Sequence, residues 1–170
     1  MRKIYVTSFF IFVIVALSCS LNAQIQQKEI NGEKYSYDSV LKHLVNNKNT
    51  VSFNNIGKEC DKISVNDSGD SLDKLFKTVF SSDRISVLAQ NNNSVTIQFF
   101  CNRDGVVINI EFFLSRANLV ESSVEKVGIT IEEIYNLEKL FTGYKFNISS
   151  ICEEDVKYVS LMKSFRFNRL

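Results

Sequence analysis

The sequence contains no proline and no tryptophan, and its 170 residues include only one histidine, six glycines and four cysteines. Without proline the chain has no proline-rich spacer, and it also lacks the glycine-rich loop that cradles phosphates. With a single histidine, most of the common catalytic sites that use histidine as an acid or base are excluded. We therefore predict no catalytic residues, no cofactor and no metal ligands.

Neither sign of charge dominates the chain, because 20 basic residues stand against 19 acidic ones and the formal net charge is +1. A protein that binds nucleic acid normally shows a basic excess on one segment, and none is visible here, so we expect no nucleic-acid partner. With 45% apolar and 23% charged residues, the composition is that of ordinary globular proteins. It excludes disorder, collagen-like repeats and a multi-span membrane protein.

Residues 1–23 are predicted to be an export signal. Arg2 and Lys3 form its basic start, and the apolar run at residues 4–17 is shorter than the roughly 20 residues that a spanning helix needs. Cleavage after Ala23 gives a soluble protein, whereas the alternative cleavage before Cys19 leaves that cysteine as a lipid anchor. We expect an exported protein, periplasmic or associated with the outer membrane, without a transmembrane helix in its mature form.

Three cysteines, Cys60, Cys101 and Cys152, remain after export. In an oxidising compartment this number permits one disulfide and leaves one thiol, and the sequence does not say which two residues pair. Cys101 ends a run of alternating apolar residues and is expected to be a small core residue. No Cys-x-x-Cys pair occurs, which argues against a zinc site or a thioredoxin-like role.

Residues 24–69 are predicted to form a helical or irregular N-terminal segment. Ser36 is expected to cap a helix that reaches about Asn46, with His43 exposed on it. The apolar residues at helical spacing are Val40, Leu41, Leu44 and Val45. Short strands are expected at residues 51–53 and 63–65.

Residues 70–114 are predicted to begin the main domain with a helix and a hairpin. Asp70 or Ser71 is expected to cap a helix that reaches Phe80 and carries one apolar stripe. Apolar and polar side chains then alternate over residues 95–101 and 106–114, which is typical of half-buried strands. The turn between these strands contains Asp104-Gly105, where glycine supplies the positive φ that a hairpin with a bulge requires.

A further helix and a long strand complete the predicted domain. Thr130 and Glu133 have the spacing of a capping box, and Gly143 is placed to end the helix that follows. A last strand is expected at residues 156–167. A helical crossover makes this strand parallel to the second hairpin strand, hence antiparallel to the first. The predicted fold is α+β, an antiparallel sheet with a strand-hairpin-strand-helix-strand core, helices packed on one face, and the last strand at the edge.

This order of elements over residues 70–170 resembles the C-terminal domain of TonB-type energy transducers, especially the form found in exported proteins of Bacteroidetes. The segments that carry the resemblance are the helix before the hairpin, Ala89-Gln90-Asn91, Asp104-Gly105 and the terminal Phe165-Arg166-Phe167. The resemblance implies a TonB C-terminal-like α+β domain. The spacer and the prolines that this family carries around its last helix and strand are absent here, so the resemblance does not extend to energy coupling.

We expect a non-enzymatic envelope protein that binds a peptide or protein partner by adding a strand to the edge of its sheet. The candidate contact residues on the last strand are Tyr158, Ser160, Met162, Ser164 and Arg166. The alternative is a small-ligand-binding protein or inhibitor of the periplasm, with a pocket lined by aromatic side chains. An enzyme would need carboxylates that converge in a cleft, such as Glu111 with Glu132 or Glu133.

Overall fold

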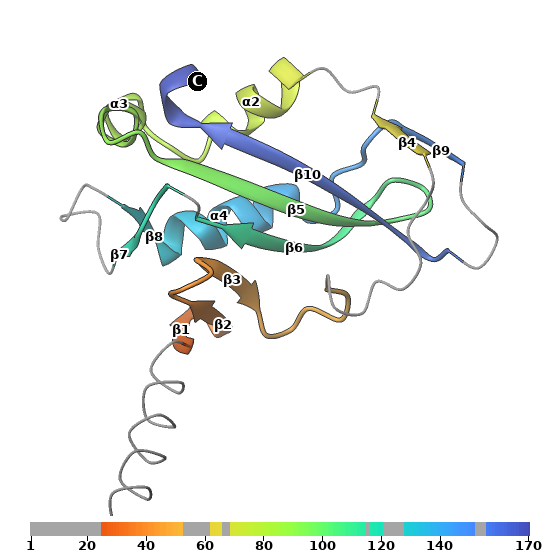
Figure 1. The fold of residues 1–170 in the computed structure, drawn as a ribbon, viewed down its shortest axis with the longest axis horizontal. Coiled ribbons are helices and arrows are strands. Elements are labelled where there is room, and N and C mark those ends of the chain that lie inside the picture. The colour runs from red at the N-terminus through yellow and green to blue at the C-terminus, as the bar shows by residue number, and fades with distance from the viewer. Residues whose placement is uncertain (1–24, 53–61, 66–68, 115, 121–127, 152–155) are drawn as a thin grey trace, which may run out of the picture.

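A computed structural model describes residues 25–52, 62–65, 69–114, 116–120, 128–151 and 156–170. Its main feature is a six-stranded antiparallel sheet with the strand order β1-β2-β3-β6-β5-β10 (Figure 1). The strands of this sheet are β1 (Ile25–Ile30), β2 (Glu33–Asp38), β3 (His43–Asn46), β6 (Val107–Phe113), β5 (Ser94–Asn102) and β10 (Tyr158–Arg166). The α+β fold predicted from the sequence is confirmed, and β1 to β3 extend the sheet beyond the predicted core.

The predicted helix from Ser36 to Asn46 is wrong, because this segment is the hairpin of β2 and β3. The Asp38 carboxylate accepts the backbone N–H groups of Val40 and Leu41, which holds a turn instead of a helix. Lys42 then takes a φ of 51°, which a helix does not allow. The predicted apolar stripe is divided as a result: Leu44 is buried, whereas Val40 and Leu41 are exposed.

The central hairpin of β5 and β6 forms as predicted. Gly105 has a φ of 81°, and a Cβ atom at this position would collide with the carbonyl oxygen of Phe146. Glycine is therefore required both by the backbone conformation and by the close approach of another segment. A predicted strand at residues 51–53 does not form at Val51 and Ser52, and the rest of that segment lies outside the described residues.

Among the described residues, three α-helices accompany the sheet: α2 (Gly69–Lys77), α3 (Ser82–Gln90) and α4 (Ile131–Phe141). The capping box of α4 is confirmed, since the Thr130 hydroxyl accepts the Glu133 N–H and the Glu133 carboxylate accepts the Thr130 N–H. Helix α2 ends at Lys77, three residues before Phe80, where the sequence predicted its end. Helix α3, whose N-cap is Ser81, was not predicted from the sequence.

The core lies between one face of the sheet and the helices. It is rich in aromatic rings, and the rings of Phe76 on α2 and Phe165 on β10 stack with their centroids 4.2 Å apart. Phe141 on α4 meets Phe99 on β5 edge to face at 5.3 Å. Strand β5 is central and β10 lies at the edge, as the crossover argument predicts. Two short strand pairs complete the fold, β4 (Lys62–Val65) with β9 (Ile148–Ile151), and β7 (Leu119–Val120) with β8 (Ile129–Thr130).

Candidate functional site at the β10 edge

Strand β10 pairs with β5 alone among the described strands, so its other side is an open sheet edge (Figure 1). The backbone N–H of Phe167 donates to the carbonyl of Asn93 at 3.2 Å, which places this pair among the hydrogen-bonded pairs of the ladder. Because these pairs alternate in an antiparallel ladder, every second residue of β10 turns its N–H and C=O away from β5. The register assigns this outward direction to Tyr158, Ser160, Met162, Ser164 and Arg166.

The side chains of these five predicted contact residues lie on the sheet face opposite the helices, and two of them are held in place. The Ser160 hydroxyl accepts a hydrogen bond from the Gln98 amide at 2.8 Å, and the Ser164 hydroxyl lies 2.8 Å from that of Thr96. Met162 is 63% exposed, and Arg166 is exposed as well. The structure thus brings the five residues together on one edge.

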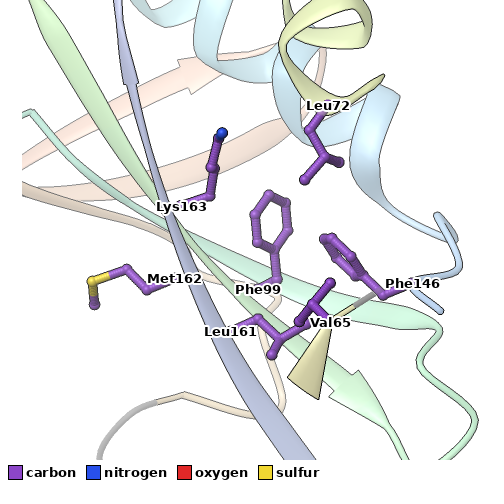
Figure 2. Close-up of a pocket in the computed structure, with 7 residues that line it drawn as sticks. All are labelled: Val65, Leu72, Phe99, Phe146, Leu161, Met162 and Lys163. Carbon is purple, nitrogen blue, oxygen red and sulfur yellow. The ribbon is translucent and has the colours of Figure 1, made fainter. Parts of the chain in front are cut away.

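An apolar cavity of about 190 Å³ lies beside the middle of β10. It is lined by Val65, Leu72, Phe99, Phe146, Leu161, Met162 and Lys163, drawn from β4, α2, β5, β10 and the segment before β9 (Figure 2). Val65 and Met162 are two of the five large apolar residues that the structure describes as exposed, at 40% and 63%. The sequence did not predict this cavity, because its walls come from five separate segments.

A second hollow of about 330 Å³ follows along the same strand toward its C-terminal end. Its lining residues are Asp73, Lys163, Ser164, Arg166, Arg169 and Leu170, three of which are basic. Lys163 also lines the apolar cavity, and its ammonium group forms a 3.2 Å ion pair with Asp73. The edge of β10 therefore borders an apolar hollow and then a basic one.

The carboxylates that an enzyme would need, Glu111 with Glu132 or Glu133, do not converge in the structure. Glu111 points to the sheet face opposite the helices, where its carboxylate oxygen lies 2.8 Å from the ring Nε2 of His43. Glu133 belongs to α4 on the other face and forms a 2.6 Å ion pair with Arg84, while Glu132 is exposed on the same helix. The sheet separates these groups, so they do not form one acid-base site.

His43 is also not the exposed helix residue that the sequence indicated. It lies on β3, and its ring stacks on that of Phe113 with the centroids 4.4 Å apart. Glu111 is almost fully buried beneath it, with 2% of its side chain exposed. A buried carboxylate needs a hydrogen-bond partner, and the His43 ring on the neighbouring strand is that partner.

A second buried carboxylate, that of Glu138 on α4, was not predicted from the sequence. It accepts a hydrogen bond from the Tyr35 hydroxyl of β2 and another from the Asn46 amide of β3 at 3.1 Å. Burial, followed by the hydrogen bond with Glu138, raises the pKa of the Tyr35 phenol well above its usual value. Glu138 lies on the helix face that carries the buried apolar residues. A polar residue at such a position is a sequence signal for a buried polar contact.

Cys101 lies in the core as predicted, and burial raises the pKa of its thiol to about 12. Cys19, Cys60, Cys152 and the predicted export signal fall outside the described residues. Within the part of the chain that the structure describes, no group of three or more His, Cys, Asp or Glu side chains is arranged to hold a metal ion. The helices in that part are also too short or too polar to cross a membrane.

Comparison with known proteins shows a shared fold and nothing about function. No family model matches the chain, and no curated protein shows significant similarity to it. Among solved structures, a DUF5043 family protein from Bacteroides uniformis ATCC 8492 is similar, with a TM-score of 0.52 over 84% of this chain and 90% of its own. The two sequences are 16% identical, so the similarity shows a shared fold and carries no statement about activity.

Proposed function

We propose that this is an exported, non-enzymatic protein of the cell envelope that binds a peptide or protein segment by adding it as a strand to β10. The observation that carries the proposal is the open edge of β10 beside an apolar cavity. The resemblance to the TonB C-terminal domain supports the same mode of binding.

Strand addition uses both features of this edge. Main-chain hydrogen bonds from five outward-facing residues would provide affinity for any extended segment, and hollows beside the strand would select its side chains. Strand β10 is nine residues long, which exceeds the length of a typical strand. Two of its inner side chains, Val159 and Phe165, are buried in the core, so the strand is held in place before a partner arrives.

A small-ligand-binding protein or an inhibitor of the periplasm remains the second candidate function. The apolar cavity of about 190 Å³ is smaller than the roughly 300–1,000 Å³ of most small-molecule sites, which favours a single side chain as its occupant. The basic hollow of about 330 Å³ reaches the lower end of that range and would suit a small anion. Titration with inorganic phosphate and with short dicarboxylates tests this candidate through shifts confined to Arg166 and Arg169.

The proposed location has its own test. Signal cleavage after Ala23 and acylation of Cys19 give mature chains of different mass and different hydrophobicity. Intact-mass measurement of the protein purified from cells distinguishes them, since a diacylglycerol adduct on Cys19 identifies a lipoprotein. An uncleaved chain in the cytoplasmic fraction would contradict export.

Strand addition is tested with ¹⁵N-labelled protein and a set of synthetic nonapeptides that carry β-forming residues at alternate positions. We expect peptide-dependent shifts of the β10 amides together with slower hydrogen exchange at its outward N–H groups. Met162→Pro removes one outward N–H while the ladder to β5 keeps its hydrogen bonds, so it should abolish binding. Met162→Ala is the matched control, because it shortens the same side chain and retains the N–H. Equal binding by both variants, or no shift in β10 with any peptide, would contradict the proposal.

A further inference from the structure

One corner of the sheet gathers apolar side chains that the core does not use. Ile25 at the start of β1, and Val40 and Leu41 in the β2–β3 turn, are 58%, 64% and 68% exposed. Ile25 pairs in register with Asp38, so the two turn residues lie only two and three positions beyond its partner. These are three of the five large apolar residues that the structure describes as exposed. A group of exposed apolar residues, unlike a single one, marks a surface that another molecule covers.

The turn that carries Val40 and Leu41 is held in a fixed conformation. The Asp38 carboxylate accepts the backbone N–H groups of both residues at 2.9 and 3.0 Å. The carbonyl of Lys42, the next residue, accepts the Leu114 N–H at 2.8 Å and so ties the turn to the end of β6. Because the turn is preformed, its contact with another molecule costs little conformational entropy.

Two cationic side chains lie beside this turn. Arg116 is exposed on the loop between β6 and β7, two residues beyond Leu114. The Lys42 ammonium group donates to the carbonyl of Ala117 at 3.4 Å and to the side-chain oxygen of Asn118 at 3.2 Å, and these neutral acceptors leave its charge in place. Basic residues next to exposed apolar ones suit the surface of a phospholipid bilayer, where phosphates adjoin the acyl chains.

The part of the chain that precedes the described residues joins the sheet at this same corner. Residues 1–24 connect directly to Ile25, and they contain the predicted export signal and Cys19, the alternative lipid anchor. Cys19 lies six residues before Ile25, and six residues reach at most about 22 Å when fully extended. A lipid on Cys19 would therefore keep this corner close to the bilayer.

We infer that the corner formed by Ile25, Val40 and Leu41 is a membrane-contact site whose apolar side chains enter the interfacial layer of a phospholipid bilayer. Lys42 and Arg116 face the lipid phosphates there. Removal of apolar surface from water and attraction between cations and anionic headgroups both favour the contact. The inference rests on the proposed envelope location, because the site needs a bilayer, and it is independent of strand addition.

This contact is compatible with a partner at β10. Strands β1 and β10 are the opposite edges of the six-stranded sheet (Figure 1). With neighbouring strands about 4.8 Å apart, the two edges are separated by about 24 Å. A bilayer at the β1 corner therefore leaves the β10 edge uncovered.

The test uses the absence of tryptophan from the chain, which makes any introduced tryptophan the single indole fluorophore. Leu41→Trp places it in the proposed site, and Met162→Trp, at a residue of similar exposure on the β10 edge, is the matched control. The mature chain that starts at Gln24 is held by an N-terminal hexahistidine tag on vesicles of phosphatidylethanolamine, phosphatidylglycerol and a nickel-chelating lipid. We expect a blue shift and quenching by brominated acyl chains for Leu41→Trp, and neither for Met162→Trp.

Further substitutions assign the insertion to the corner. Ile25→Ser combined with Val40→Ser in the Leu41→Trp protein should lower the insertion constant, measured from the quenching, about tenfold. Arg116→Gln should lower it about fivefold on vesicles with phosphatidylglycerol and leave it unchanged on phosphatidylcholine vesicles. Lys157→Gln, at an exposed lysine just before β10, is the control for charge and should have no effect.

Three outcomes would overturn the inference. Quenching of neither tryptophan shows that the corner does not insert, and equal quenching of both shows that the tethered protein contacts lipid without a preferred face. A blue shift of Leu41→Trp that needs no vesicles and grows with protein concentration shows that a second copy covers the corner. Each result leaves export and strand addition to their own tests, the intact mass and the peptide shifts at β10.

Discussion

The two edges of the six-stranded sheet are built differently. Strand β1 has six residues, most of its side chains are exposed, and it carries the charged pair Lys28 and Glu29. Strand β10 has nine residues and buries Val159 and Phe165 in the core. Charged side chains on a short strand are a common means of discouraging further pairing, whereas an anchored strand with hollows beside it is suited to receive a partner.

The difference extends to how each half of the sheet is attached to the helices. Near β10 the contact is aromatic, with Phe76 of α2 stacked on Phe165. Near β1 it is polar, because Glu138 of α4 accepts hydrogen bonds from Tyr35 and Asn46. One half should therefore respond to loss of apolar volume, and the other to loss of hydrogen-bond partners and to pH.

The largest effect should come from Phe165→Ala. It removes a ring that is 1% exposed and stacked on Phe76, and the free energy of unfolding should fall by about 3–5 kcal/mol. Ile25→Ala at the opposite edge removes a side chain that is 58% exposed and should cost less than about 0.5 kcal/mol. Urea unfolding measures both values. Similar losses at the two edges would contradict the difference in anchoring.

Glu138→Ala should have the next largest effect. It leaves the buried Tyr35 hydroxyl without its acceptor, at a cost of about 1–3 kcal/mol in the free energy of unfolding. Adding Tyr35→Phe should recover part of the loss, because the unsatisfied donor is then gone. Glu132→Ala on the exposed side of the same helix is the control. Strictly additive losses in the double variant would argue against a coupled pair.

Alkaline pH should weaken the β1 half through Tyr35. Its pKa is raised in the folded state, so its contribution to stability is complete below about pH 10, the unfolded pKa, and is lost as the pH rises. By pH 11 the loss should be about 1 kcal/mol. Tyr37, whose pKa is also raised by burial, should act in the same direction. Urea unfolding between pH 8 and 11 should therefore show a smaller decline for Tyr35→Phe than for the unchanged protein.

The smallest change concerns the thiol of Cys101, which pairs in register with Val159 of β10. Because burial raises its pKa to about 12, iodoacetamide at pH 8 should modify it only when the edge opens. Peptide mapping by mass spectrometry measures the rate at this position. Phe165→Leu should accelerate the reaction, whereas Ile25→Ala should leave it unchanged. Rapid labelling of the unchanged protein would show that the β10 edge is not anchored.

The sequence predicted the second half of the chain better than the first, for a physical reason. Strong local signals coincide with the fold from β5 onward, since the alternation of β5 and β6, Gly105 and the Thr130 capping box each act within a few residues. The segment from Ser36 to Asn46 has helical spacing, but pairing of β3 with β6 and the turn at Asp38 override it. Tertiary contacts commonly outweigh helix propensity in this way.

The candidate site was predicted in part. Alternation along the last strand identified the five residues whose main chain faces the open edge, and the crossover rule placed that strand at the edge. Neither hollow could be found from the sequence, because each one forms only when β10 meets α2, the residues near β4, or the C-terminal segment. The pairing of His43 with Glu111 joins residues 68 positions apart and carries no local signal.

By itself, the sequence determined which residues alternate, where the α4 helix begins and where the hairpin turns, because these depend on backbone preferences and on side chains a few positions away. It also determined that the chain has one histidine, no proline and nearly balanced charge. Only the tertiary structure decided that Ser36–Asn46 forms strands, that two carboxylates are buried with partners, and that an apolar and a basic hollow adjoin β10. Those features depend on contacts between segments far apart in the chain, whose energies exceed the local preferences of the residues involved.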